Sequence, residues 1–114
     1  MDRTAYLETI QQHLKIAYLL SDEKTAAMIP VFVNTLQAHV DRLAELAACG
    51  DMQQLSRASH AVKGALLNMG LTDLALTAHT LEKQCLAGDS TFDYQALVNK
   101  LQYTVLQFSS ERKK

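Results

Sequence analysis

The stretch that decides the fold is Asp51–Gly70, DMQQLSRASHAVKGALLNMG. Asp favours the N-cap of a helix, and Gly favours the position just beyond a helix end. Between these two signals, apolar side chains recur at helical spacing. At about 100° per residue they form one face, flanked by Ala58 and Ser59 and made of Leu55, Val62, Leu66 and Met69. The sequence therefore predicts a helix over about 52–69 with one buried face.

His60 is predicted to face solvent in the middle of this helix, away from the apolar stripe. The far side and one edge of the helical wheel carry Arg57, Ser56, His60, Lys63, Gly64 and Leu67. Each residue alone has an ordinary explanation: a surface His, a solvating Lys, or a Gly that lets another helix pack closely. Gly in an exposed helix interior costs about 1 kcal/mol relative to Ala, however. The combination of His, Lys and Gly opposite the core therefore favours a functional site.

The chemistry of this triplet fits a histidine that carries a phosphoryl group. Histidine is the one side chain whose ordinary pKa is near neutrality, so its neutral form can act as a nucleophile at cellular pH. The ammonium of Lys63, one turn from His60, can neutralise a phosphoryl oxygen as a point charge. The absent side chain at Gly64 leaves space for another protein to approach.

The rest of the chain is predicted to be helical as well. Hydrophobic residues make up 48% and aromatics only 6%, and the abundance of Ala and Leu favours helices. A first helix is expected over about 4–20, a second helix that ends at about 49, and another over about 72–87. A last helix is expected to open at Asp89-Ser-Thr91. Ser21-Asp22-Glu23 resembles a cap with an acidic first turn, and Pro30 either starts or kinks the second helix. Short loops make neighbouring helices antiparallel, which predicts an all-α, up-down four-helix bundle with an additional N-terminal helix.

Length and composition exclude several classes of protein. A chain of 114 residues suits a single domain, with a core over 25–108 and an N-terminal helix within 1–21. The net charge of −1 gives no sign of nucleic-acid binding. There is no apolar run of the ~20 residues that span a membrane, and no signal-peptide pattern. We expect a cytoplasmic monomer in which Cys49 and Cys85 are small core or helix-end residues.

The segment from Gly50 to Leu71 resembles the histidine-containing phosphotransfer (HPt) family. That family's central signature is a Gly-Asp helix break and a Leu, then Ala/Ser-His-x-x-Lys-Gly and a further Gly. The similarity continues on the next predicted helix, and it covers roughly residues 25 to 108. The matching positions on that helix are Leu74, Ala75, Ala78, Leu81 and Glu82.

The resemblance implies a phosphorelay intermediate. His60 would accept a phosphoryl group from a histidine kinase or from the phospho-aspartate of a response-regulator receiver domain, and pass it to a receiver aspartate. Lys63 would offset the charge of the phosphoryl group, and Gly64 would let the receiver approach. The chain has no P-loop and no kinase motif, so we expect a phosphocarrier rather than an enzyme. It would need no cofactor of its own, since the receiver would supply Mg²⁺.

Four further positions have predicted binding roles. Glu82 falls where some family members hydrogen-bond the active His. A carboxylate there would orient the ring and raise its basicity, but would also repel a phosphoryl group. The helical wheel places Arg57, Ala61 and Leu67 on the receiver-docking surface.

Three alternatives remain open at this stage. His13, His39 and His79 lack metal-ligand spacing, so we expect no metal site, and we assign His39 and His79 half-buried structural or surface positions. An HPt-like adaptor would bind a signalling partner without carrying phosphate. Helical patterns up to both ends of a chain that begins with Met1 favour a free-standing protein over the phospho-accepting domain of a larger kinase. The sequence names no cognate partner and no direction of phosphoryl flow.

Overall fold

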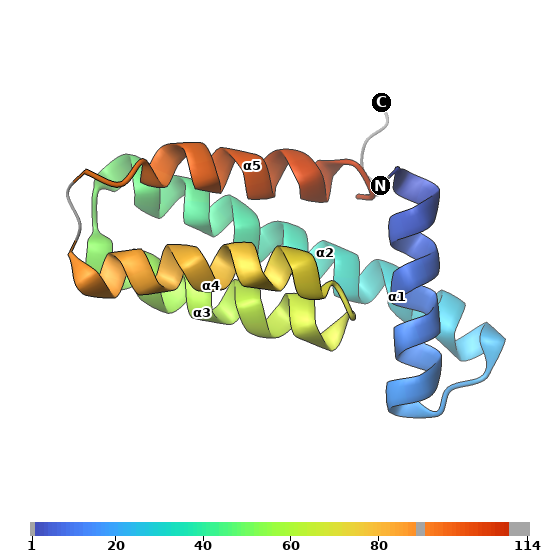
Figure 1. Cartoon of the computed structure of the whole chain (residues 1–114). Coiled ribbons are helices and arrows are strands. Elements are labelled where there is room, and N and C mark those ends of the chain that lie inside the picture. Colours follow the sequence, from blue (N-terminus) through green and yellow to red (C-terminus); the bar gives the residue numbers. More distant parts are fainter. Residues whose placement is uncertain (1, 89–90, 110–114) are drawn as a thin grey trace.

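Five helices make up the described part of the computed structural model, residues 2–88 and 91–109 (Figure 1). They are α1 (Arg3–Tyr18), α2 (Asp22–Cys49), α3 (Met52–Asn68), α4 (Thr72–Ala87) and α5 (Tyr94–Leu106). Helices α2 to α5 run alternately up and down side by side, and α1 crosses one end of this bundle. No strand occurs in these residues. The predicted all-α bundle with an additional N-terminal helix is confirmed.

Capping side chains mark the starts of α2 and α3. The Ser21 hydroxyl accepts a hydrogen bond from the Lys24 backbone at 3.2 Å, and the Asp51 carboxylate accepts one from the Gln54 backbone at 3.1 Å. Both caps were predicted from residue type. Helix α2 begins directly after Ser21, so Pro30 lies inside this helix and does not start it.

The predicted start of the last helix was wrong. Helix α5 begins at Tyr94, and its cap is Asp93, whose carboxylate accepts from the Ala96 backbone at 3.0 Å. Of the predicted opening Asp89-Ser-Thr91, the first two residues lie outside the described part of the chain. The Tyr94 hydroxyl donates to the Gln84 carbonyl of α4 at 3.0 Å, which ties the first turn of α5 to α4.

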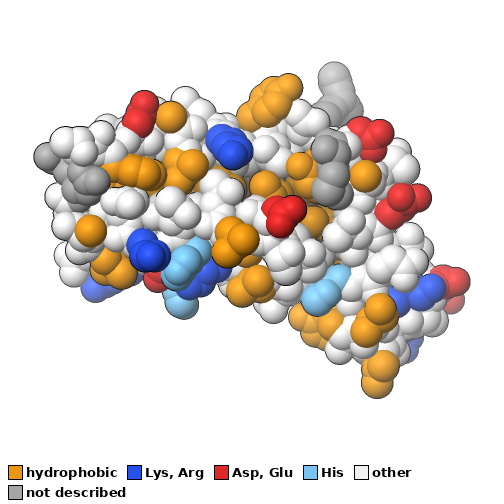
Figure 2. Space-filling view, in the orientation of Figure 1, with side chains coloured by type: hydrophobic (Ala, Val, Ile, Leu, Met, Phe, Trp, Pro, Cys, Tyr) orange, Lys and Arg blue, Asp and Glu red, His pale blue; other side chains and the backbone are white. Residues whose placement is uncertain are grey.

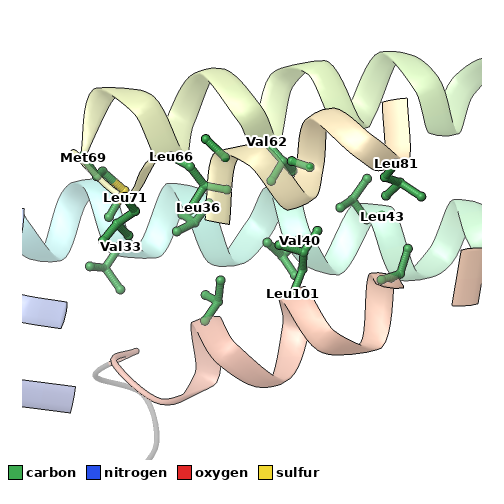
Figure 3. Packing of buried hydrophobic residues seen from close by; sticks show 14 of the residues in the cluster. Val33, Leu36, Val40, Leu43, Val62, Leu66, Met69, Leu71, Leu81 and Leu101 are labelled. Carbon is green, nitrogen blue, oxygen red and sulfur yellow. The ribbon is translucent and has the colours of Figure 1, made fainter. Parts of the chain in front are cut away.

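A continuous apolar core fixes how each helix is rotated (Figure 3). The predicted stripe of α3 is fully buried in it. Truncating one such side chain to Ala typically costs about 2–5 kcal/mol, so a helix rotated out of register would be strongly disfavoured. The buried hydrophobic residues are Ile10, Leu14, Val33, Leu36, Val40, Leu43, Leu46, Leu55, Val62, Leu66, Met69, Leu71, Ala75, Ala78, Leu81, Cys85, Val98, Leu101, Val105 and Phe108.

Helix α1 packs against the turn that joins α3 to α4. It buries Ile10 and Leu14 in the core. Gly70 in the turn has φ +77°, and a Cβ built on it would lie 2.6 Å from the Cβ of His13. Any other residue at Gly70 would be strained by its backbone and would also collide with α1. His13 is therefore a packing residue at this turn.

Candidate functional site

His60 projects into solvent from the middle of α3. Its side chain is 68% exposed, while Val62 and Leu66 on the other face of the helix are fully buried. The exposed position agrees with the helical periodicity of the sequence. Burial of the apolar stripe holds α3 in the orientation that presents the imidazole.

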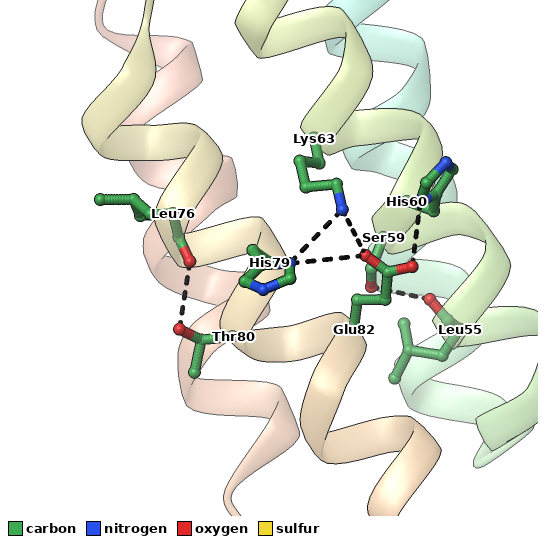
Figure 4. A network of polar contacts seen from close by, with 8 residues as sticks. All are labelled: Leu55, Ser59, His60, Lys63, Leu76, His79, Thr80 and Glu82. Atoms are coloured by element: carbon green, nitrogen blue, oxygen red, sulfur yellow. Dashed lines mark hydrogen bonds and ion pairs between the residues drawn. The ribbon is translucent and has the colours of Figure 1, made fainter.

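One nitrogen of the imidazole is held by a carboxylate from α4 (Figure 4). The Nδ1 of His60 lies 2.9 Å from Oε2 of Glu82. An ionised carboxylate can only accept hydrogen bonds, so Nδ1 is the donor and carries a proton. In the neutral ring this leaves the lone pair on Nε2. The contact therefore selects the tautomer whose Nε2 is the nucleophilic atom.

The Glu82 carboxylate is also paired with Lys63. The Lys63 Nζ lies 3.0 Å from Oε1 of Glu82, whose side chain is only 15% exposed. Burial alone would raise the pKa of Glu82, but the hydrogen bonds from Lys63 and His60, together with their charges, outweigh it and lower this pKa. The carboxylate is therefore ionised at neutral pH, and its charge is balanced locally.

His79, predicted from the sequence to be a structural or surface histidine, is a fourth member of this cluster. Its Nδ1 lies 3.4 Å from the Lys63 Nζ and 3.9 Å from Oε1 of Glu82. His79 and Glu82 are three residues apart on α4, as His60 and Lys63 are on α3, so each pair shares one helix face. This repeated spacing is the sequence signal that could have identified His79.

Gly64 has no packing role within the fold. A Cβ added there would meet no atom within 4 Å. The interpretation that Gly64 lets a neighbouring helix pack closely is therefore wrong. Gly64 instead lines a surface groove between α2 and α3, whose other lining residues are Met28, Val31, Phe32, Thr35, His39, Ala61, Ala65 and Asn68.

The three residues predicted from the wheel to dock a partner lie on different parts of the α3 surface. Ala61 lies in the α2–α3 groove beside Gly64. Leu67 is exposed in a separate apolar groove between α3 and α4, together with Lys63 and His79. Arg57 is exposed on α3. On the face drawn in Figure 2, hydrophobic side chains lie next to a cluster of His and basic side chains over α4.

Metal-ligating side chains do not cluster in residues 2–88 and 91–109. No group of three or more His, Cys, Asp or Glu side chains there is arranged to hold a metal ion. Both cysteines are free, Cys49 exposed at the end of α2 and Cys85 buried in α4. In the same residues, no helix is both long and apolar enough to cross a membrane.

Comparison with protein-family models identifies the family. The Hpt domain model matches residues 27–108, well over half of the chain and all four members of the polar cluster. The chain belongs to the Hpt domain family. Domains of this family are phosphocarriers in two-component signal transduction and interact with histidine kinases and receiver domains. Helix α1 lies outside the matched range. Neither the curated proteins nor the solved structures gave a match.

Proposed function

We propose that this Hpt domain is a phosphorelay carrier in which His60 takes up a phosphoryl group and passes it to the aspartate of a receiver domain. The donor is a histidine kinase or the phospho-aspartate of another receiver. The observation that carries the proposal is the bond from His60 Nδ1 to Glu82, which leaves Nε2 unprotonated on an exposed side chain.

The transfer step needs only one nucleophilic atom from this chain. When the donor is a phospho-aspartate, His60 Nε2 attacks phosphorus. The new N–P bond forms as the bond from phosphorus to the aspartate oxygen breaks, and the carboxylate leaves with the electron pair. Nδ1 keeps its proton, so the phosphorylated ring is cationic and Glu82 stabilises it. Mg²⁺ on the receiver supplies charge neutralisation from the other side.

The pairing with Lys63 offsets the negative charge of Glu82 at this site. An uncompensated Glu82 would repel the incoming phosphoryl group. With Lys63 at 3.0 Å, the pair is close to neutral. Glu82 therefore orients His60 without adding a net negative charge, and Lys63 remains close enough to exchange between the carboxylate and phosphoryl oxygens.

The receiver is placed over the groove between α2 and α3. Gly64 and Ala61 line this groove from α3, and the exposed side chains Met28 and Val31 line it from α2. Small residues on one side and exposed apolar residues on the other fit a partner that must come close to His60. In this arrangement Leu67 and Arg57 lie at the margins of the interface.

The test is to map the label after incubation with a receiver domain charged from a radiolabelled small phosphodonor. We expect an acid-labile, base-stable label on wild type, none on His60→Gln, and full labelling of the control Lys83→Gln, an exposed cation on α4 outside the cluster. His60→Gln should remain folded by circular dichroism, because the side chain is exposed. Labelling of His60→Gln would exclude His60 as the acceptor. Receiver binding by wild type without any labelling would favour the adaptor function.

A further inference from the structure

His79 belongs to the polar cluster but takes no part in the transfer step described above. Its Nδ1 is close to both Lys63 and Glu82, at 3.4 Å from Nζ and 3.9 Å from Oε1. Its side chain is 47% exposed, compared with 15% for Glu82, so His79 can exchange protons with water directly. The two α4 residues thus approach the same ammonium from adjacent turns (Figure 4).

The contact between His79 and Lys63 favours one tautomer of His79. An ammonium has three N–H donors and no lone pair, so Nδ1 of His79 must be the acceptor. The ring is then neutral, with its proton on Nε2. A protonated ring would instead place a second positive charge against the ammonium. A neutral His79 therefore holds Lys63 against Glu82, whereas a charged His79 would drive Lys63 away and could take its place.

We propose that His79 is a positioning residue for Lys63 and that it replaces Lys63 at Glu82 once His60 carries a phosphoryl group. This inference rests on the proposed phosphocarrier function. The phosphoryl dianion on His60 attracts the Lys63 ammonium away from the carboxylate. Leaving a largely buried carboxylate without a counter-charge is strongly unfavourable. His79 takes one proton from water and donates it as a hydrogen bond to Oε1, which keeps Glu82 neutralised.

The surroundings of His79 contain the groups that this exchange needs. From α3 it is faced by Lys63, with His60 beyond, and from its own helix by Glu82. No other ion pair reaches these four side chains within the described ranges. The ion pairs of the cluster are therefore made among its own members, and the exposed Lys83, four residues after His79 on α4, is a further positive charge on the same helix face.

Two variants separate the two roles of His79, which are to hold Lys63 against Glu82 and to replace Lys63 there. In His79→Asn, the amide oxygen takes the place of Nδ1 and can still accept from Lys63, but it cannot become a cation. In His79→Leu, both abilities are lost. We expect the initial rate of phosphoryl uptake to fall about tenfold in His79→Leu, because one partly exposed hydrogen bond to a charged group is lost. In His79→Asn that hydrogen bond is kept, so the rate should stay within about twofold of wild type. Lys83→Gln serves as the control and should match wild type.

Nitrogen-15 NMR of the histidine rings tests both steps directly. In the unphosphorylated protein near neutral pH, His79 should show a protonated Nε2 and an unprotonated Nδ1, and this preference should weaken in Lys63→Met. After phosphorylation, both ring nitrogens of His79 should be protonated. A merely structural His79 would show no such change.

The outcomes distinguish this inference from the function on which it rests. If wild type is labelled on His60 but His79→Leu takes up phosphate at the wild-type rate, the inference about His79 fails and the phosphocarrier function stands. A protonated Nδ1 in the unphosphorylated protein would overturn the inference as well, without any phosphate being present. If wild type takes no label from any well-folded receiver, both fail together.

Discussion

Replacing Gly64 with Ala should make this protein more stable. Gly64 lies in the interior of α3, its backbone is helical, and an added Cβ would meet no atom within 4 Å. The exchange therefore gains the full helix-propensity difference, about 1 kcal/mol, with no steric cost. For a domain of this size that corresponds to an increase in Tm of about 4 °C.

Gly88 provides a matched control for this prediction. It also has no atom within 4 Å of an added Cβ, but its φ is +69° at the C-terminal end of α4. Ala in the left-handed conformation costs about 1–2 kcal/mol. Gly88→Ala should therefore lower the free energy of unfolding by up to about 1 kcal/mol once the smaller chain entropy of unfolded Ala is included, opposite in sign to Gly64→Ala although both sites are open. Urea and thermal denaturation of both variants, followed by circular dichroism, give the two values.

The same position should show a trade-off between stability and transfer. Gly64→Gln adds a good helix former whose side chain projects into the α2–α3 groove. We expect it to be more stable than wild type, yet to exchange phosphate with receivers more slowly because the partner cannot come close. A lower stability of Gly64→Ala would refute the assignment of Gly64 as an unstrained open position. Wild-type transfer by a stabilised Gly64→Gln would refute its role in partner approach.

Two further changes test the fold and the electrostatics. Leu19 is 89% exposed and has φ 55°, a backbone conformation that costs a residue such as Leu about 1–2 kcal/mol. Leu19→Gly should therefore raise the free energy of unfolding, measured in urea, by up to about 1 kcal/mol once the greater chain entropy of unfolded Gly is included. A lower free energy of unfolding would contradict strain at that cap. The lowered pKa of Glu82 stabilises the fold above the ordinary carboxyl value of 4.5, and this contribution is lost as the pH falls through the lower folded value. Stability measured from about neutral to acidic pH should therefore fall less steeply in Glu82→Gln than in wild type, and parallel curves would argue against the lowered pKa.

The third helix could be predicted almost completely because its signals agree with one another. Asp51 caps it, a Gly follows its end, and its apolar stripe faces the core. The start of α5 could not be predicted in the same way. Several capping residues stand in succession between 89 and 93, and the choice among them depends on tertiary contacts. Asp93 is the residue that caps the helix. The next residue, Tyr94, donates from its hydroxyl to the Gln84 carbonyl, and the Tyr94 ring packs against Phe92 with ring centroids 5.0 Å apart.

The exposure of His60 followed from periodicity, but its partners did not. Periodicity gives the face of one helix and says nothing about which residues of the next helix lie opposite. The role of Glu82 was suggested by resemblance alone, and the contact between Lys63 and His79 was not foreseen. Both depend on the register of α3 against α4, which is set by the turn between them and by the side chains buried around it.

That register is visible in the chain positions of the contacting pairs. His60 and Glu82 are equally far from Leu71 along the sequence, and so are Lys63 and His79. The turn around Leu71 therefore acts as the centre of an antiparallel ladder, and a shift of one residue there would separate both pairs. Gly70 forms this turn in a left-handed conformation, with His13 of α1 occupying the space where its side chain would be. Although α1 lies outside the range matched by the family model, it packs on the turn that sets the geometry of the site.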